Sequence, residues 1–124
     1  MKNLKKTLKA LPLSQRGKKR YVLFEIFAEK PLSATQVEKA VVQKFAELFG
    51  SKGLAEQKLQ FIGFYGLKNQ GILKCSLEKC EEVKAGLLFL KSISGIQCIP
   101  SIVSVSGSVK KLKELSESKR VQNL

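Results

Sequence analysis

The order of strand and helix patterns along the chain constrains the fold more than any other feature. Strand patterns cover residues 21–28, 57–64, 71–77 and 96–106, helical patterns cover residues 30–50 and 77–92, and a short basic helix follows Ser108. Two right-handed crossovers in this order give one antiparallel four-stranded sheet with both helices on one face. The sequence therefore predicts an α+β, ferredoxin-like βαββαβ domain, the arrangement also used by RNA-recognition motifs.

Single residues mark several boundaries of these elements. Ser33 and Gln36 form a capping-box pattern at the start of the first helix, and Gly50 is the candidate terminator of that helix. Gly86 costs a helix interior about 1 kcal/mol relative to alanine, so we expect a close backbone approach at this position. Pro100 cannot donate a ladder hydrogen bond, which places the last strand at a sheet edge or at a bulge.

The first strand has two different faces because its side chains alternate. One face is purely apolar (Val22, Phe24, Ile26), and the other combines Glu25 with three large side chains (Tyr21, Leu23, Phe27). Tyr21, Leu23 and Phe27 are better explained as a protein interface or as the surface beneath the terminal helix than as a nucleic-acid platform. The sequence leaves both alternatives open.

The net charge of +13 indicates a polyanionic partner, with nucleic acid as the first candidate. Residues 1–20 contribute +8 and residues 108–124 contribute +3, whereas the segment between them contributes only +2. An isolated run of cations is usually just solvated, but these ends lack the acids that would offset the charge. We therefore expect RNA phosphate contacts from two clusters at the ends: Arg16, Lys18, Lys19 and Arg20, and Lys110, Lys111 and Lys113.

The sequence offers little support for catalysis by the isolated chain. It contains no histidine, no glycine-rich phosphate loop and no GxSxG motif. An acylphosphatase-like site would need an arginine after the first strand, where residues 28–32 supply only Lys30. The segment GILKCSL, residues 71–77, lacks the aromatic residues with which RNA-recognition motifs stack bases. We expect no catalytic residue in this chain.

The three cysteines, Cys75, Cys80 and Cys98, lie in apolar surroundings and do not form the pattern of a secreted disulfide framework. The spacing of Cys75 and Cys80 could suggest a metal, but no histidine or fourth thiol completes a tetrahedral site. We expect buried thiols, no metal site and a reducing, cytoplasmic location. No apolar run approaches the roughly 18 residues that a membrane span requires, so we expect no membrane partner.

The domain organisation predicted from these patterns has three parts. Residues 1–16 form a basic arm, which we expect to be flexible and to order on a partner, although a basic amphipathic helix or an organelle presequence has a similar pattern. Residues 17–118 form the single domain, including the terminal helix. Residues 119–124 are a tail.

Three stretches resemble the archaeal ribonuclease P protein component 2 family. LPLSQRGKKRYVLFEI, Leu11 to Ile26, looks like its proline-containing basic lead into a K-K-R-Y-apolar strand. QGILKC, Gln70 to Cys75, is similar to its glycine-apolar-apolar-basic-cysteine strand, and VSGSVKKL, Val105 to Leu112, is similar to its V-S-G-T-basic ending. The chain departs from the family pattern at Gly17, which replaces an acidic residue, and in the strongly basic residues before Ala10.

The resemblance implies a ferredoxin-like protein without an active site of its own. Such a protein works with ribonuclease P RNA and with ribonuclease P protein component 3 to remove the 5′ leader of precursor tRNA, and the RNA requires Mg²⁺. The resemblance leaves open whether the chain forms a homodimer or a heterotetramer. The alternative is a general RNA-binding or ribosome-associated module of the same fold, and a small enzyme is a distant third.

Overall fold

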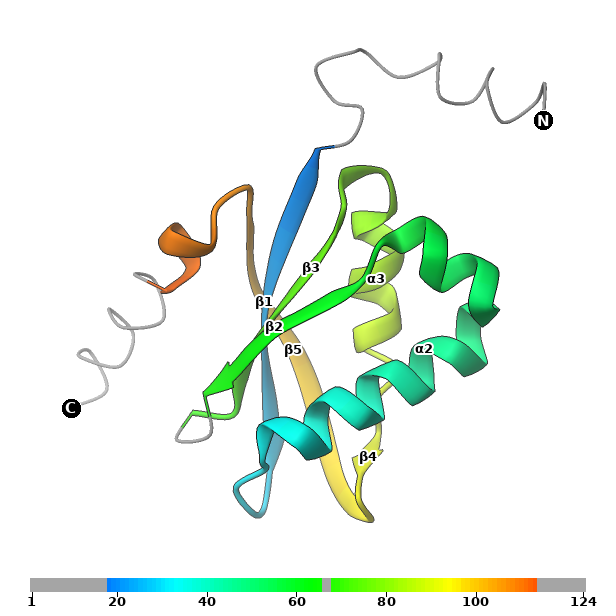
Figure 1. Ribbon diagram of the computed structural model, residues 1–124. Coiled ribbons are helices and arrows are strands. Elements are labelled where there is room, and N and C mark those ends of the chain that lie inside the picture. Colours follow the sequence, from blue (N-terminus) through cyan, green and yellow to red (C-terminus); the bar gives the residue numbers. More distant parts are fainter. Residues whose placement is uncertain (1–17, 66–67, 114–124) are drawn as a thin grey trace.

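The elements follow the predicted order, with one short strand added (Figure 1). The structure is a computed structural model and describes residues 18–65 and 68–113. Its elements are β1 (Lys19–Ala28), α2 (Ala34–Gln57), β2 (Gln60–Tyr65), β3 (Gln70–Ser76), the 3₁₀ turn η1 (Leu77–Lys79), α3 (Cys80–Leu87), β4 (Ser92–Ile93) and β5 (Ile96–Ser106). Residues 109–113 are also helical. The predicted arm and tail, and the rest of the predicted terminal helix, lie outside the described residues.

The sheet has the strand order β2-β3-β1-β5-β4, and every pairing in it is antiparallel. Without β4, this is the strand order of the ferredoxin-like fold, which confirms the predicted fold class. β4 was not predicted, because its two residues are too few to form a strand pattern. A tight turn with positive φ at Ser94 (52°) and Gly95 (79°) joins it to β5, as in a two-residue hairpin.

Pro100 occupies the position that its missing N–H requires. β4 pairs only with Ile96 and Gln97, so among the described strands the outer side of β5 is a free edge at Pro100. The register between β1 and β5 also shifts next to Val103, because Leu23 faces Ser104 while Phe24 faces Ile102. The last strand therefore has both features predicted for it, an edge and a bulge.

The first helix begins where the sequence predicts and extends beyond the predicted end. Ser33 accepts a hydrogen bond from the Gln36 backbone, and the Gln36 side chain accepts one from the Ser33 backbone, so the capping box is complete. Gly50 leaves the helical conformation with φ of 70°, and a further helical segment then runs to Gln57. The strand predicted from residue 57 therefore starts at Gln60.

The second helix is shorter than the apolar spacing of residues 77–92 predicts. It starts as the 3₁₀ turn η1 and ends at Leu87. Leu90 fits the helical spacing but lies beyond the helix end, and it is buried in the core from the turn before β4. Leu90 is apolar because it is buried, and its spacing from the apolar residues of the helix matches a helical repeat only by position. Apolar spacing alone therefore does not show where the helix ends.

Apolar residues pack on both faces of the sheet. The main core lies between the sheet and helices α2 and α3, and it includes Phe24, Phe45 and Leu73. The opposite face, which we call the open face, carries a smaller cluster in which Leu23 and Ile72 pack with Leu112 of the terminal helical residues. Figure 1 shows α2 and α3 on one side of the sheet and residues 109–113 on the other.

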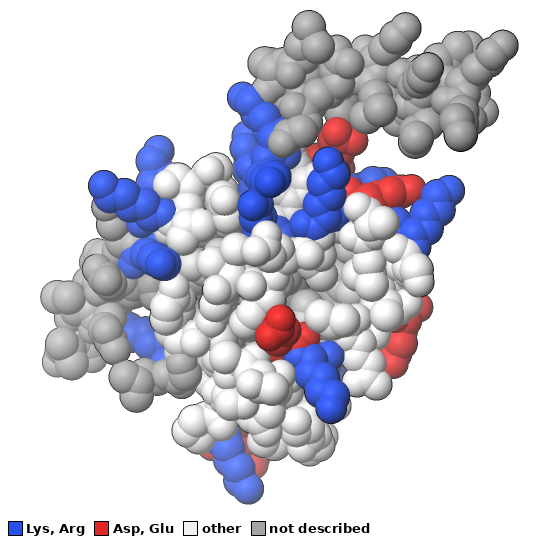
Figure 2. Space-filling model, viewed as in Figure 1, with Lys and Arg blue, Asp and Glu red and all other residues white. Residues whose placement is uncertain are grey.

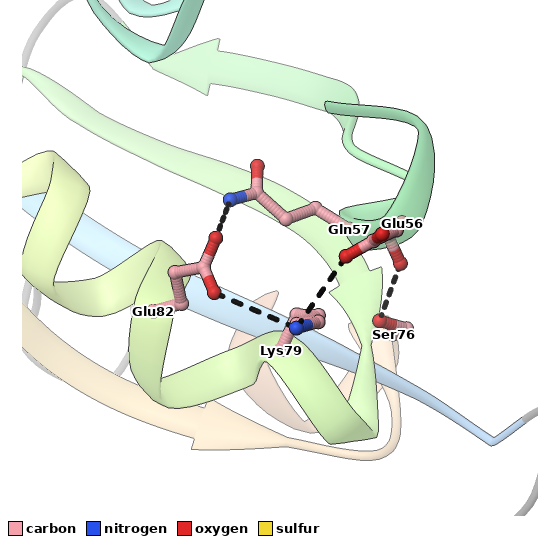
Figure 3. A network of polar contacts seen from close by, with 5 residues as sticks. All are labelled: Glu56, Gln57, Ser76, Lys79 and Glu82. Atoms are coloured by element: carbon pink, nitrogen blue, oxygen red, sulfur yellow. Dashed lines mark hydrogen bonds and ion pairs between the residues drawn. The ribbon is translucent and has the colours of Figure 1, made fainter. Parts of the chain in front are cut away.

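A polar network joins the end of α2 to β3 and α3 (Figure 3). Gln57, which is fully buried, donates a hydrogen bond of 2.7 Å to Glu82, and Ser76 donates one of 3.2 Å to the Glu56 carbonyl oxygen. Lys79 bridges the two carboxylates, at 3.5 Å from Glu56 and 3.8 Å from Glu82. These contacts fix the helical layer against one end of β3.

Gly86 tests the packing between the two helices. A methyl group at this position would lie 2.8 Å from Cζ of Phe45 and 2.9 Å from Cε2 of Phe49. We expect Gly86→Ala to lower the free energy of unfolding by about 1–2 kcal/mol, because overpacking outweighs the roughly 1 kcal/mol gained in helix propensity. Urea denaturation measures this change, and Ala85→Gly at the exposed neighbouring position measures the propensity contribution alone. A stabilised Gly86→Ala protein would contradict the close packing.

Candidate functional site

The two cationic clusters predicted at the chain ends lie at the same end of the sheet. Because β1 and β5 are antiparallel, with Tyr21 opposite Ser106, the start of β1 lies beside the end of β5. A methyl group added at Gly107, just after β5, would lie 3.4 Å from Nη1 of Arg20. Residues 109–113 follow directly. Figure 2 shows Lys and Arg side chains around the start of β1 and beside this helical segment.

We call this surface the basic end and define it by six residues: Lys18, Lys19, Arg20, Lys110, Lys111 and Lys113. Five of them are exposed. Arg20 is half-buried, and its guanidinium donates a hydrogen bond of 2.9 Å to the Lys19 carbonyl oxygen. The Lys18 carbonyl oxygen accepts a hydrogen bond of 2.9 Å from the Leu77 backbone, which fixes the start of β1. Arg16, the seventh predicted contact, lies outside the described residues.

Lys74 adds a cation that the sequence analysis missed. It lies on β3 directly opposite Tyr21 of β1. Contact with the Lys74 amine and its positive charge lower the pKa of Lys19 below its ordinary value, with a smaller contribution from burial. A single lysine within a strand gives no distinctive sequence signal, so only the pairing of β1 with β3 reveals this neighbour.

Carboxylates are paired with lysines elsewhere on the domain. Lys44 lies 3.3 Å from Glu47, Lys84 lies 2.7 Å from Glu81, and Lys79 joins the network of Figure 3. Within residues 18–65 and 68–113, no ion pair includes Lys74 or a residue of the basic end. The positive charge of this surface is therefore not neutralised by the described part of the domain.

The three residues predicted for a protein interface have different environments. Leu23 is fully buried beneath Leu112, so the domain itself covers it. Tyr21 is half-buried and packs against the same cluster. Phe27 is 56% exposed at the far end of β1, opposite Ile99, which is 69% exposed. These two side chains border a surface hollow of about 470 Å³.

The cysteine thiols are buried and unpaired. Burial raises the pKa of the Cys75 thiol to about 12, with a further contribution from Cys80 beside it, and burial also raises the pKa of Cys98. The raised pKa values keep the thiols of Cys75 and Cys98 protonated near neutral pH, and a protonated thiol is a poor nucleophile and a poor metal ligand. In the described residues, His, Cys, Asp and Glu form no group of three or more that could hold a metal ion.

A model described as the Rpp14/Pop5 family matches residues 20–116. The chain belongs to the Rpp14/Pop5 family. Its relatives include the "Ribonuclease P protein component 2" of Archaeoglobus fulgidus, which is 34% identical over 106 residues, covering 86% of this chain and 94% of the relative. The protein of the same name from Methanosarcina mazei is 34% identical, covering 86% and 90%. That from Thermococcus kodakarensis is 33% identical, covering 85% and 88%.

These matches confirm the family resemblance carried by the three sequence stretches. A chain in the structure titled "Cryo-EM structure of yeast Ribonuclease MRP" has the same fold as this Rpp14/Pop5 member. The TM-score is 0.59 at 10% identity, covering 85% of this chain and 93% of the other. Among the described residues, no helix has both the length and the apolar character needed to cross a membrane.

The proximity of Lys19 and Lys74 makes a prediction about protonation. Removing the charge of Lys74 makes protonation of Lys19 less costly, so we expect Lys74→Gln to raise the pKa of Lys19 toward its ordinary value. NMR titration of the Lys19 side chain measures this shift. Lys39→Gln, on the exposed side of α2, removes the same charge at a distance and serves as the control. An unchanged Lys19 pKa in Lys74→Gln would show that the two amines are not neighbours.

Proposed function

We propose that this chain is a noncatalytic protein subunit of ribonuclease P. In this role it binds the catalytic RNA together with a partner, ribonuclease P protein component 3, and supports removal of the 5′ leader from precursor tRNA. The observation that carries the proposal is the basic end, where two distant cationic segments converge without a described carboxylate partner in a chain of this family. The names of its archaeal relatives support the same role.

The basic end contributes to this activity by neutralising charge. Ribonuclease P RNA and precursor tRNA are both polyanions, so their approach is opposed by electrostatic repulsion. Lysine ammonium groups donate hydrogen bonds to phosphate oxygens and release condensed counterions, which favours binding without reading the bases. Mg²⁺ would supply the chemistry at the reacting phosphate and would be held by the RNA. The protein side chains position the RNA and hold no reacting group.

The partner protein needs a different surface. Phe27 and Ile99 are exposed apolar side chains on paired strands, at the other end of β1 from Lys19. We propose that component 3 covers this patch, because contiguous apolar surface is a common feature of protein interfaces. Tyr21 would contribute only the exposed part of its side chain to this interface. Leu23 is buried beneath Leu112, so it would support the interface from inside the domain. Formation of a homodimer or a heterotetramer stays a prediction.

A second function is consistent with the same cations. Lysines bind phosphates of any structured RNA, so the basic end would also suit a general RNA-binding or ribosome-associated module. The two functions differ in what the bound protein does. A subunit of ribonuclease P increases cleavage by its RNA, whereas a general module binds RNA without changing cleavage.

Reconstituted cleavage distinguishes these two functions. We expect cleavage of precursor tRNA by the cognate ribonuclease P RNA with component 3 to increase when this chain is added at moderate Mg²⁺. The control reaction omits the RNA. We expect no cleavage in it, because in the proposed role this chain holds no active site. RNA binding without any increase in cleavage would favour the general module.

Charge reversal tests the basic end itself. We expect Lys18→Glu, Lys19→Glu and Arg20→Glu together to weaken binding to the RNA and to reduce the steepness of its salt dependence by about two to three units. The matched control reverses three exposed lysines outside the basic end: Lys30, Lys39 and Lys52. Filter binding across a range of salt concentrations measures both the affinity for the RNA and its salt dependence. If both triple variants lose the same affinity for the RNA, the loss reflects net charge alone, and the basic end is not the RNA-binding site.

A further inference from the structure

We propose that Lys19 and Lys74 form a phosphodiester-binding pair on the open face of the sheet. This pair extends the RNA contact from the chain ends across β1 onto β3, a strand that the basic end does not include. The inference rests on the proposed function, since it takes the RNA backbone of ribonuclease P as the ligand. Its support comes from the strand register, the assignment of faces and the charges around the pair.

The register places the two lysines diagonally across a pair of strands. Lys19 faces Ser76 and Lys74 faces Tyr21, so Lys74 lies two residues before the direct partner of Lys19. Diagonal neighbours in an antiparallel pair lie about 7–8 Å apart at their backbones, within reach of long side chains. Two flexible lysine side chains can therefore bring their ammonium groups to one anion.

Both lysines project from the open face. On β3, Leu73 and Cys75 belong to the main core, whereas Ile72 belongs to the cluster on the open face. Side chains alternate along a strand, so Lys74 shares the face of Ile72. By the same alternation, Lys19 shares the face of Leu23 on β1. Neither lysine is covered by α2 or α3.

Coverage by the terminal helical residues ends next to this pair. Leu112 packs over Leu23 and Ile72, and Tyr21 lies at the border of that cluster. Beyond this border, Lys74 is half-exposed and Lys19 is exposed. The half-buried Tyr21 lies directly opposite Lys74 and packs against this cluster, so the lysine pair lies at the border of an apolar surface.

The free protein keeps the two like charges together at a cost. Like charges on neighbouring strands repel. Contact with the Lys74 amine and, second to it, the positive charge of Lys74 lower the pKa of Lys19. The described residues offer no ion pair to either ammonium group. A phosphodiester has one negative charge and two free oxygens, so it can accept a hydrogen bond from each lysine and remove the repulsion. A surface serving only solubility gains nothing from this arrangement.

The test measures binding of the cognate ribonuclease P RNA to the full chain over a range of salt concentrations. We expect Lys74→Gln to weaken binding roughly five- to tenfold at 0.1 M salt and to reduce the slope of log affinity against log salt by about one. Lys39→Gln removes an equal charge from the exposed side of α2 and is expected to leave the slope unchanged. Thermal unfolding of both variants reports whether folding is affected, and we expect Lys74→Gln to be at least as stable as the unchanged protein.

A second measurement follows the pair directly. We expect the pKa of Lys19 to rise when the RNA binds to the unchanged protein, because the phosphate favours the charged form. If Lys74→Gln binds with the affinity and slope of Lys39→Gln, the pair is overturned while the proposed function stands. If the unchanged protein does not bind the RNA, both proposals are overturned. If the protein binds and Lys74→Gln has no effect on binding or on cleavage, Lys74 is an ordinary solvated lysine.

Discussion

The structure depends on the position of β1 between β3 and β5. This strand is paired on both edges and has buried side chains on both faces, with Phe24 in the main core and Leu23 in the cluster on the open face. Its backbone hydrogen bonds and its buried apolar residues therefore connect different parts of the domain. The strand can begin with the charged Lys19 because this end of the strand is exposed to solvent and needs no apolar side chain.

This arrangement connects the fold to the distribution of charge. Antiparallel pairing of β1 with β5 brings residues distant in the sequence to one edge of the domain, so two modest cationic segments become one surface. Pairing of β1 with β3 adds Lys74 to it. Six of the eight described carboxylates lie on α2, η1 and α3, where Glu56 and Glu82 share Lys79 (Figure 3). The separation of positive from negative charge on the domain thus follows from strand register as well as from composition.

The strength of local signals decided how much of this could be predicted from the sequence. The capping box at Ser33 and the edge position of Pro100 follow from the chemistry of the residues themselves, and both were predicted. The end of the second helix was predicted too late, because Leu90 is buried without being helical. Lys74 was missed because a cluster formed by strand pairing has no pattern along the chain. The coverage of Leu23 by Leu112 was one of two open alternatives, since periodicity does not show which segment covers a face.

The packing of Leu112 on the open face has a thermodynamic consequence. Because Leu112 is fully buried, residues 109–113 lose conformational freedom when the domain folds and not when a ligand arrives. The lysines beside it are held on a preorganised backbone, which reduces the entropy lost on association. Weakening this packing would leave the number of charges unchanged and would still lower affinity, so hydrophobic side chains that touch no ligand help to set the strength of an electrostatic contact.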